Sequence, residues 1–199
     1  MIHKSIDYHE QYDKHLIIFD FDETICHNPD AKVYIGNKKT SEMIEMTPTD
    51  YSEWRATGEY EKDPDKWDMD FKEYRSYPHG GKPITKIVEK LKHYSSHDHY
   101  IVALVTGRDN LAGPKQWMND FYIPVKNMTL MCCGNPDKRN CYRSLINTFG
   151  PMHVTIYEDS IECIKQCEEI CEIFNIPFSG VLVENEKTSI NWRKNELRR

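Results

Sequence analysis

The feature that most constrains this chain is a short apolar run that leads straight into two aspartates. Residues 15–25 are HLIIFDFDETI, in which Leu16 to Phe19 are apolar and Asp20 and Asp22 follow one residue apart. Such a run is typical of a strand buried on both faces, as in a parallel sheet. Open α/β sheets bind ligands at the carboxyl ends of their strands. The two carboxylates therefore predict a site for Mg²⁺, or for a phosphoryl group that one of them attacks.

An Asp-x-Asp segment also occurs in ordinary turns and helix caps, so the rest of the chain has to decide. Two further apolar runs end in polar residues. Residues 100–105 (YIVALV) lead into Thr106-Gly107-Arg108, and residues 154–157 (VTIY) lead into Glu158-Asp159. A hydroxyl and more carboxylates at strand ends favour a functional site over a structural turn.

The alternation of apolar runs with helical stretches predicts an α/β fold with a central parallel sheet and right-handed crossovers. We predict strands at residues 15–20, 100–106, 127–133, 153–158 and 178–184, and helices at 83–95, 112–121, 138–148 and 161–174. Residues 26–82 contain no long apolar run but are rich in aromatic residues, which favours packing over disorder. We therefore expect a core of residues 1–25 and 83–199, with residues 26–82 as a small, irregular cap or flap inserted after the first strand.

Composition indicates a globular protein of 199 residues, with 39% hydrophobic and 29% charged residues. The chain has no apolar run of about 18 residues, so we expect no membrane span. The N-terminal residues MIHKSIDYHEQYDK lack the apolar core of a signal peptide. Seven cysteines occur without a Cys-x-x-Cys pair, which disfavours a zinc site and is consistent with a reducing, cytoplasmic setting. The oligomeric state stays open.

The ordered set of motifs resembles the haloacid dehalogenase (HAD) superfamily of phosphohydrolases. The matching residues are Asp20, Asp22 and Thr24 in the first motif, Thr106 in the second, Lys138 in the third, and Glu158 and Asp159 in the fourth. Arg143 and Lys126 are the second and third choices for the cation of the third motif. The resemblance implies a Rossmannoid three-layer sandwich, with the five strands in the order fifth, fourth, first, second, third.

The resemblance also implies roles for these residues. Asp20 would be the nucleophile that forms an aspartyl-phosphate, and Asp22 the general acid and base. Thr106 and the Gly107 backbone would bind phosphoryl oxygens, and Lys138 would stabilise negative charge. The implied Mg²⁺ ligands are Asp20, Asp159 with Glu158 assisting, and the backbone carbonyl of Asp22.

The segments around these motifs are similar to the phosphatase domains of polynucleotide kinase–phosphatases and to the HAD domain of Swiss-army-knife RNA repair proteins. The likeness implies removal of a 3′-terminal phosphate from DNA or RNA, with Arg108 helping to hold the substrate. The net charge of −6 disfavours broad nucleic-acid binding, yet residues 107–145 carry six basic and three acidic residues. Two alternatives remain: the same chemistry on a nucleotide or small phosphorylated metabolite, and a non-catalytic HAD-like binding module.

Overall fold

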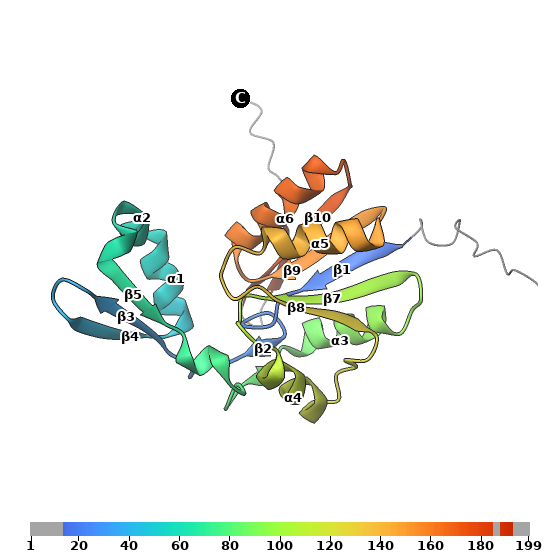
Figure 1. Ribbon diagram of the computed structural model, residues 1–199. Coiled ribbons are helices and arrows are strands. Elements are labelled where there is room, and N and C mark those ends of the chain that lie inside the picture. Colours follow the sequence, from blue (N-terminus) through green and yellow to red (C-terminus); the bar gives the residue numbers. More distant parts are fainter. Residues whose placement is uncertain (1–13, 185–187, 193–199) are drawn as a thin grey trace, which may run out of the picture.

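The core of the molecule is a mainly parallel sheet, seen in a computed structural model that describes residues 14–184 and 188–192. Its strand order is β11-β10-β9-β1-β7-β8 (Figure 1). The strands are β1 (His15–Phe19), β7 (Tyr100–Thr106), β8 (Met128–Cys132), β9 (His153–Glu158), β10 (Phe178–Glu184) and β11 (Thr188–Trp192). Neighbours from β10 to β8 are parallel, whereas β11 is antiparallel to β10. The five predicted strands and their order are confirmed, and β11 was not predicted.

Four helices cover the two faces of this sheet, which confirms the predicted α/β class (Figure 1). One face packs on α3 (Thr85–Ser95) and α4 (Ala112–Asp120), and the other on α5 (Arg139–Phe149) and α6 (Ile161–Ile173). All four predicted helices are present within two residues of their expected ends. The arrangement of helix, sheet and helix layers is compatible with a Rossmann-like fold.

The side chains of strand β1 are buried on both faces of the sheet. Ile17 and Phe19 belong to the hydrophobic cluster under α3 and α4, while Leu16 and Ile18 belong to the cluster under α5 and α6. All four side chains are fully buried. Burying one such side chain stabilises the fold by about 1.5–3 kcal/mol, so this strand is firmly placed. The position of the aspartate that follows it is fixed accordingly.

Residues 26–82, called the insert below, contain regular elements where we expected irregular structure. Strands β2 (Cys26–His27) and β6 (Lys82–Pro83) pair at its base. Strands β3 (Val33–Asn37), β4 (Glu42–Met46) and β5 (Trp67–Asp70) form an antiparallel sheet in the order β4-β3-β5. The helices are α1 (Pro48–Ala56), α2 (Glu59–Lys62), η1 (Pro64–Lys66) and η2 (Lys72–Arg75). The insert stands beside the core on the side of the sheet's carboxyl edge (Figure 1).

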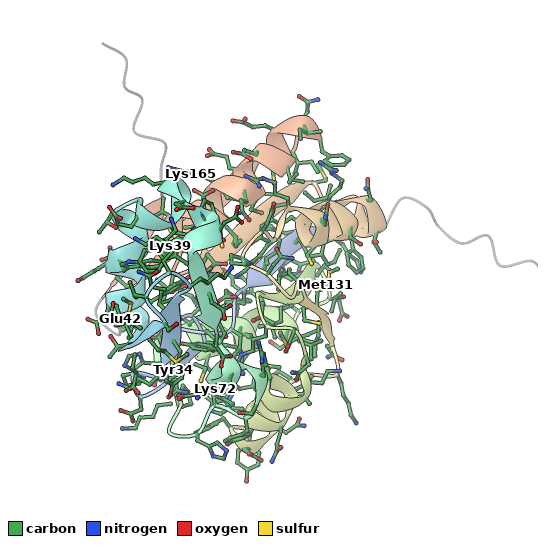
Figure 2. The ribbon with its side chains drawn as sticks, turned by 60° about the vertical axis from the view of Figure 1, so that its left-hand side comes forward. Tyr34, Lys39, Glu42, Lys72, Met131 and Lys165 are labelled. Atoms are coloured by element: carbon green, nitrogen blue, oxygen red, sulfur yellow. The ribbon has the colours of Figure 1, made fainter. Side chains whose placement is uncertain are left out.

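Aromatic contacts hold the insert together, as its composition predicted. The rings of Trp54 and Trp67 lie 5.2 Å apart in an edge-to-face arrangement. The Lys72 ammonium lies 4.0 Å from the centre of the Tyr34 ring, and Figure 2 shows these two side chains close together. Such contacts supply a small core that the short strands alone would not provide. Within the described residues, no helix has the length and apolar character needed to cross a membrane.

Candidate active site

The carboxyl ends of three adjacent strands bring the predicted motifs together. In the register of the sheet, Phe19 of β1 is level with Leu104 of β7 and with Tyr157 of β9. Asp20 therefore emerges beside Glu158, and Thr106 lies at the end of the next strand. This juxtaposition follows from parallel pairing, because all three strands end at the same edge.

The loop after β1 is held in a tight turn. The Asp20 backbone N–H donates to the Tyr157 carbonyl over 3.0 Å, so Asp20 is still anchored to the sheet. The Phe21 carbonyl then accepts from the N–H groups of Ile25 and Cys26 at 3.0 and 2.9 Å. Glu23 takes a left-handed conformation with φ of 53° to make this turn. The turn places Asp20 and Asp22 at the edge of the sheet with different neighbours.

Lys138 links two buried carboxylates. Its Nζ donates to Asp20 Oδ1 over 2.6 Å and to Glu158 Oε2 over 2.8 Å, and all three side chains are buried. Lys138 precedes the first turn of α5, and its backbone N–H donates to Gln166 Oε1 of α6 over 2.9 Å. Lys138 is therefore held at its backbone by Gln166 and at its ammonium by Asp20 and Glu158. Arg143 and Lys126, the other candidates for this cation, are exposed.

The acidic residues around Lys138 have strongly raised pKa values. Burial, followed by the charge of Glu158, raises the pKa of Asp20 to about 8. Burial also raises the pKa of Glu158 to about 8, although the Lys138 charge opposes the shift. Burial lowers the pKa of Lys138, but the charges of Asp20 and Glu158 outweigh that effect and raise it well above its usual value. The crowding of like charges makes this site a strong acceptor for a cation.

A divalent cation fits the donor set at this edge. Carboxylate oxygens of Asp20, Glu158 and Asp159 all lie within 4.8 Å of one another. Desolvation of its carboxylate among the neighbouring acids, followed by the charge of Asp20, raises the pKa of Asp159 to about 7. Asp159 is the most exposed residue of the three, so we take its pKa to be the least perturbed. Three carboxylates beside one ammonium leave two negative charges when all are ionised. Hard oxygen donors with surplus negative charge are the ligands that Mg²⁺ prefers.

Thr106 and Gly107 offer hydrogen-bond donors beside Asp20's strand. The Thr106 Oγ1 accepts from the Arg108 backbone N–H over 3.3 Å, which leaves its own hydroxyl proton to donate elsewhere. The Thr106 carbonyl accepts from the Cys133 N–H over 2.9 Å, so the end of β7 is fixed against the loop after β8. A Cβ on Gly107 would meet the Asn135 carbonyl at 3.3 Å, a tight contact that a side chain could make only if the Asn135 backbone shifted slightly. The Thr106 hydroxyl and the Gly107 backbone N–H are therefore held at the carboxyl end of β7.

Asp22 is not one of the three clustered carboxylates, and its side chain pairs with Arg108. The Arg108 Nε donates to Asp22 Oδ2 over 2.9 Å, and Nη2 donates to Asp22 Oδ1 over 2.7 Å. A third bond runs from Nη1 to the Ser76 carbonyl of the insert over 2.7 Å. Sequence reasoning placed Arg108 near the site but did not foresee this pairing. The role of Arg108 in holding substrate stays a prediction.

Two supporting residues were missed at the sequence level. Gln166 is a polar side chain on the buried face of α6, between Cys163 and Ile170 at helical spacing, and it accepts from Lys138. A buried glutamine on an otherwise apolar face was the signal that could have identified it. Ser76 acts through its backbone carbonyl, and no residue type at that position would have revealed this contact.

Comparison of the chain with protein-family models, with curated proteins and with solved structures finds no match in any of the three. The geometry of the site and the motifs of the sequence therefore carry the assignment of function.

Proposed function

We propose that the protein is a Mg²⁺-dependent phosphomonoester hydrolase that works through an aspartyl-phosphate on Asp20. The observation that carries the proposal is the buried bridge from Lys138 to Asp20 and Glu158 at the carboxyl edge of adjacent parallel strands. A structural ion pair has no need to assemble three acids around one lysine, because such crowding costs stability. A nucleophile with a cation beside it accounts for the arrangement better.

In the proposed reaction, an Asp20 carboxylate oxygen attacks phosphorus and the ester oxygen departs. Asp22, which must enter the first step protonated, gives that proton to the leaving oxygen, and the resulting carboxylate then takes one from the water that hydrolyses the acyl phosphate. Thr106 and the Gly107 N–H donate to phosphoryl oxygens, and the Lys138 ammonium stabilises charge on Asp20 and on the phosphate. Asp20, Asp22, Thr106 and Gly107 lie at or just beyond a strand end in the described fold, and Lys138 directly precedes α5.

The cation in this proposal would be held by Asp20, by Asp159 with Glu158 assisting, and by the Asp22 carbonyl. The close spacing of the three carboxylates and their raised pKa values support this assignment. When bound, Mg²⁺ reduces the electrostatic repulsion between an attacking carboxylate and an anionic phosphate. Lys138 by itself leaves that repulsion only partly offset.

The proposed substrate is a nucleic acid with a 3′-terminal phosphate. Residues 107–145, which carry six basic and three acidic residues, include the loops after β7 and β8 at the site's edge of the sheet. Arg108 and Lys138 are already paired with acids, so the exposed cations of this segment, such as Lys115 and Lys126, would attract a phosphate-bearing strand end even though the whole chain is at −6. The similarity of the motif segments to end-healing phosphatases supports the same choice.

The test compares phosphate release from four substrates with and without EDTA: a 3′-phosphorylated oligonucleotide, its 5′-phosphorylated isomer, a mononucleotide and p-nitrophenyl phosphate. We expect Mg²⁺-dependent release from all good esters and the highest kcat/KM for the 3′-phosphorylated strand. A higher kcat/KM for the mononucleotide would indicate that the substrate is a nucleotide or another small phosphorylated metabolite. Absence of release from every ester would refute the phosphatase proposal and favour a binding module.

A further inference from the structure

The contacts of Arg108 differ from those of a residue that grips a substrate. Three of its N–H groups are taken by protein acceptors: both Asp22 oxygens and the Ser76 carbonyl. Its side chain is only 2% exposed, whereas that of Asp22 is 20% exposed. The guanidinium is therefore behind the aspartate, and Asp22 is the member of the pair that a ligand can reach.

Aromatic rings hold the guanidinium in this orientation. Its central carbon lies 5.1 Å from the centre of the Phe21 ring and 5.6 Å from that of Tyr74. Phe21 comes from the loop that carries Asp20 and Asp22, while Tyr74 comes from η2 of the insert. Both rings lie within the range of a cation–π contact, and lysine cannot form the bidentate pair with Asp22, so the site suits arginine.

The Ser76 carbonyl is itself fixed by the core. A Cβ on Gly113, in the first turn of α4, would lie 2.3 Å from the Ser76 oxygen and 2.7 Å from the Tyr77 nitrogen. The close approach of α4 to this part of the insert therefore requires glycine at position 113. The nearby Asn110 Nδ2 adds a hydrogen bond to the Arg75 carbonyl over 2.9 Å. Contacts thus run without a break from α4 through Ser76 and Arg108 to Asp22.

We propose that Arg108 is a positioning residue, which anchors Asp22 to the insert through Ser76 and holds its carboxylate in the orientation that proton transfer requires. Asp22 follows β1 on an irregular turn, and among the described residues its side chain makes no hydrogen bond other than those with Arg108. Arg108 then affects turnover only through Asp22, and the insert affects turnover through Arg108. The inference rests on the proposed function, because its readout is phosphoester hydrolysis.

The first test is a double-mutant cycle on kcat/KM with a 3′-phosphorylated oligonucleotide. Arg108→Ala should lower kcat about a hundredfold, the scale expected when a catalytic group is misplaced by about 1 Å, and should change KM by less than about threefold. In an Asp22→Asn background the same substitution should cost less than about threefold. Arg108→Lys should restore little, because lysine makes no bidentate pair. Lys62→Ala, which removes an exposed cation of the insert paired with Glu59, outside residues 107–145, is the matched control.

The second test leaves both members of the pair intact. Gly113→Ala should push the Ser76 carbonyl away and lower kcat at least about tenfold, although alanine suits a helix better than glycine. Gly36→Ala is its control, because a Cβ there would make only ordinary contacts with Asp68, 3.5 Å away. Circular dichroism and thermal melting verify that each variant is folded. If Arg108→Ala does not fold, Arg108→Lys and Gly113→Ala carry the test.

The outcomes separate this inference from the function on which it rests. Equal losses of kcat/KM for Arg108→Ala in the wild-type and Asp22→Asn backgrounds would overturn the positioning role. A large rise in KM that Arg108→Lys reverses would do the same, and either result would indicate that Arg108 binds the substrate directly. The phosphatase proposal would survive that result. Absence of turnover by the wild-type protein on every ester would remove both.

Discussion

Replacing Lys138 by methionine tests the bridge between Asp20 and Glu158. Methionine keeps most of the side-chain volume but removes two charge-assisted hydrogen bonds, of 2.6 and 2.8 Å. Loss of one preorganised charge stabiliser lowers kcat by roughly a hundredfold or more, which is about 2.7 kcal/mol of transition-state stabilisation. Hydrolysis of p-nitrophenyl phosphate measures this loss. The matched control is Arg143→Met, at an exposed position on α5, which should change kcat by less than about threefold.

The same variant should change stability in a pH-dependent way. Breaking a buried ion pair by removing one partner costs about 3–5 kcal/mol when the remaining charge stays ionised. Asp20 and Glu158 have pKa values of about 8, so at low pH they are protonated and escape that cost. Urea unfolding in EDTA should therefore show a larger loss above about pH 8 than near pH 6. Loss of turnover in Arg143→Met but not in Lys138→Met would refute the role given to Lys138. An equal loss of unfolding free energy in Lys138→Met at both pH values would refute it too.

Three further predictions concern the acids of the site. Asp20→Asn should abolish turnover and leave the fold intact, because asparagine keeps the shape of the side chain and an oxygen that can accept from Lys138 but loses the charged nucleophile; kcat and thermal melting measure the two effects, and near-normal turnover would exclude Asp20 as nucleophile. Asp22→Asn should damage hydrolysis of a sugar 3′-phosphate more than that of p-nitrophenyl phosphate, whose leaving group needs little protonation; equal losses in kcat/KM would count against the acid role. For the wild-type protein in EDTA, the folded-state pKa values of Asp20, Glu158 and Asp159 lie above their ordinary values, so the native state binds more protons than the unfolded state, and the free energy of unfolding should fall as pH rises from about 4 to about 8. Urea titrations across this range test the sign, and added Mg²⁺ should restore more stability near pH 8 than near pH 5, because protons compete for the same oxygens.

The core of the fold was predictable because its signals are local. An apolar run such as Leu16 to Phe19 has the length of a buried strand, and strands alternate with helices along the chain. Polar residues directly after three such runs were bound to meet once the strands paired in parallel. The contact of Lys138 with Asp20 and Glu158 could be expected only from the family resemblance, because no local pattern distinguishes Lys138 from the other cations nearby.

The insert and the Arg108 pairing were less accessible to sequence reasoning. Strands β3, β4 and β5 are short and partly exposed, so their apolar alternation is weak, and aromatic contacts between distant residues hold them. The bond from Arg108 to Ser76 uses a backbone carbonyl, which every residue possesses. Strand β11 pairs antiparallel with β10, the last predicted strand, and its sequence has no apolar run that would have predicted it.

The central claim is a covalent phosphate on Asp20, and acid quenching during turnover tests it most directly. A 3′-phosphorylated oligonucleotide labelled in the terminal phosphate would be mixed with the protein and Mg²⁺, quenched in acid and digested for mass spectrometry. We expect a base-labile, hydroxylamine-sensitive phosphate on the peptide that contains Asp20, lost in Asp20→Asn and present in the Arg143→Met control. Turnover by the wild-type protein with no phosphate on Asp20 at any time before the steady state would contradict the proposed mechanism.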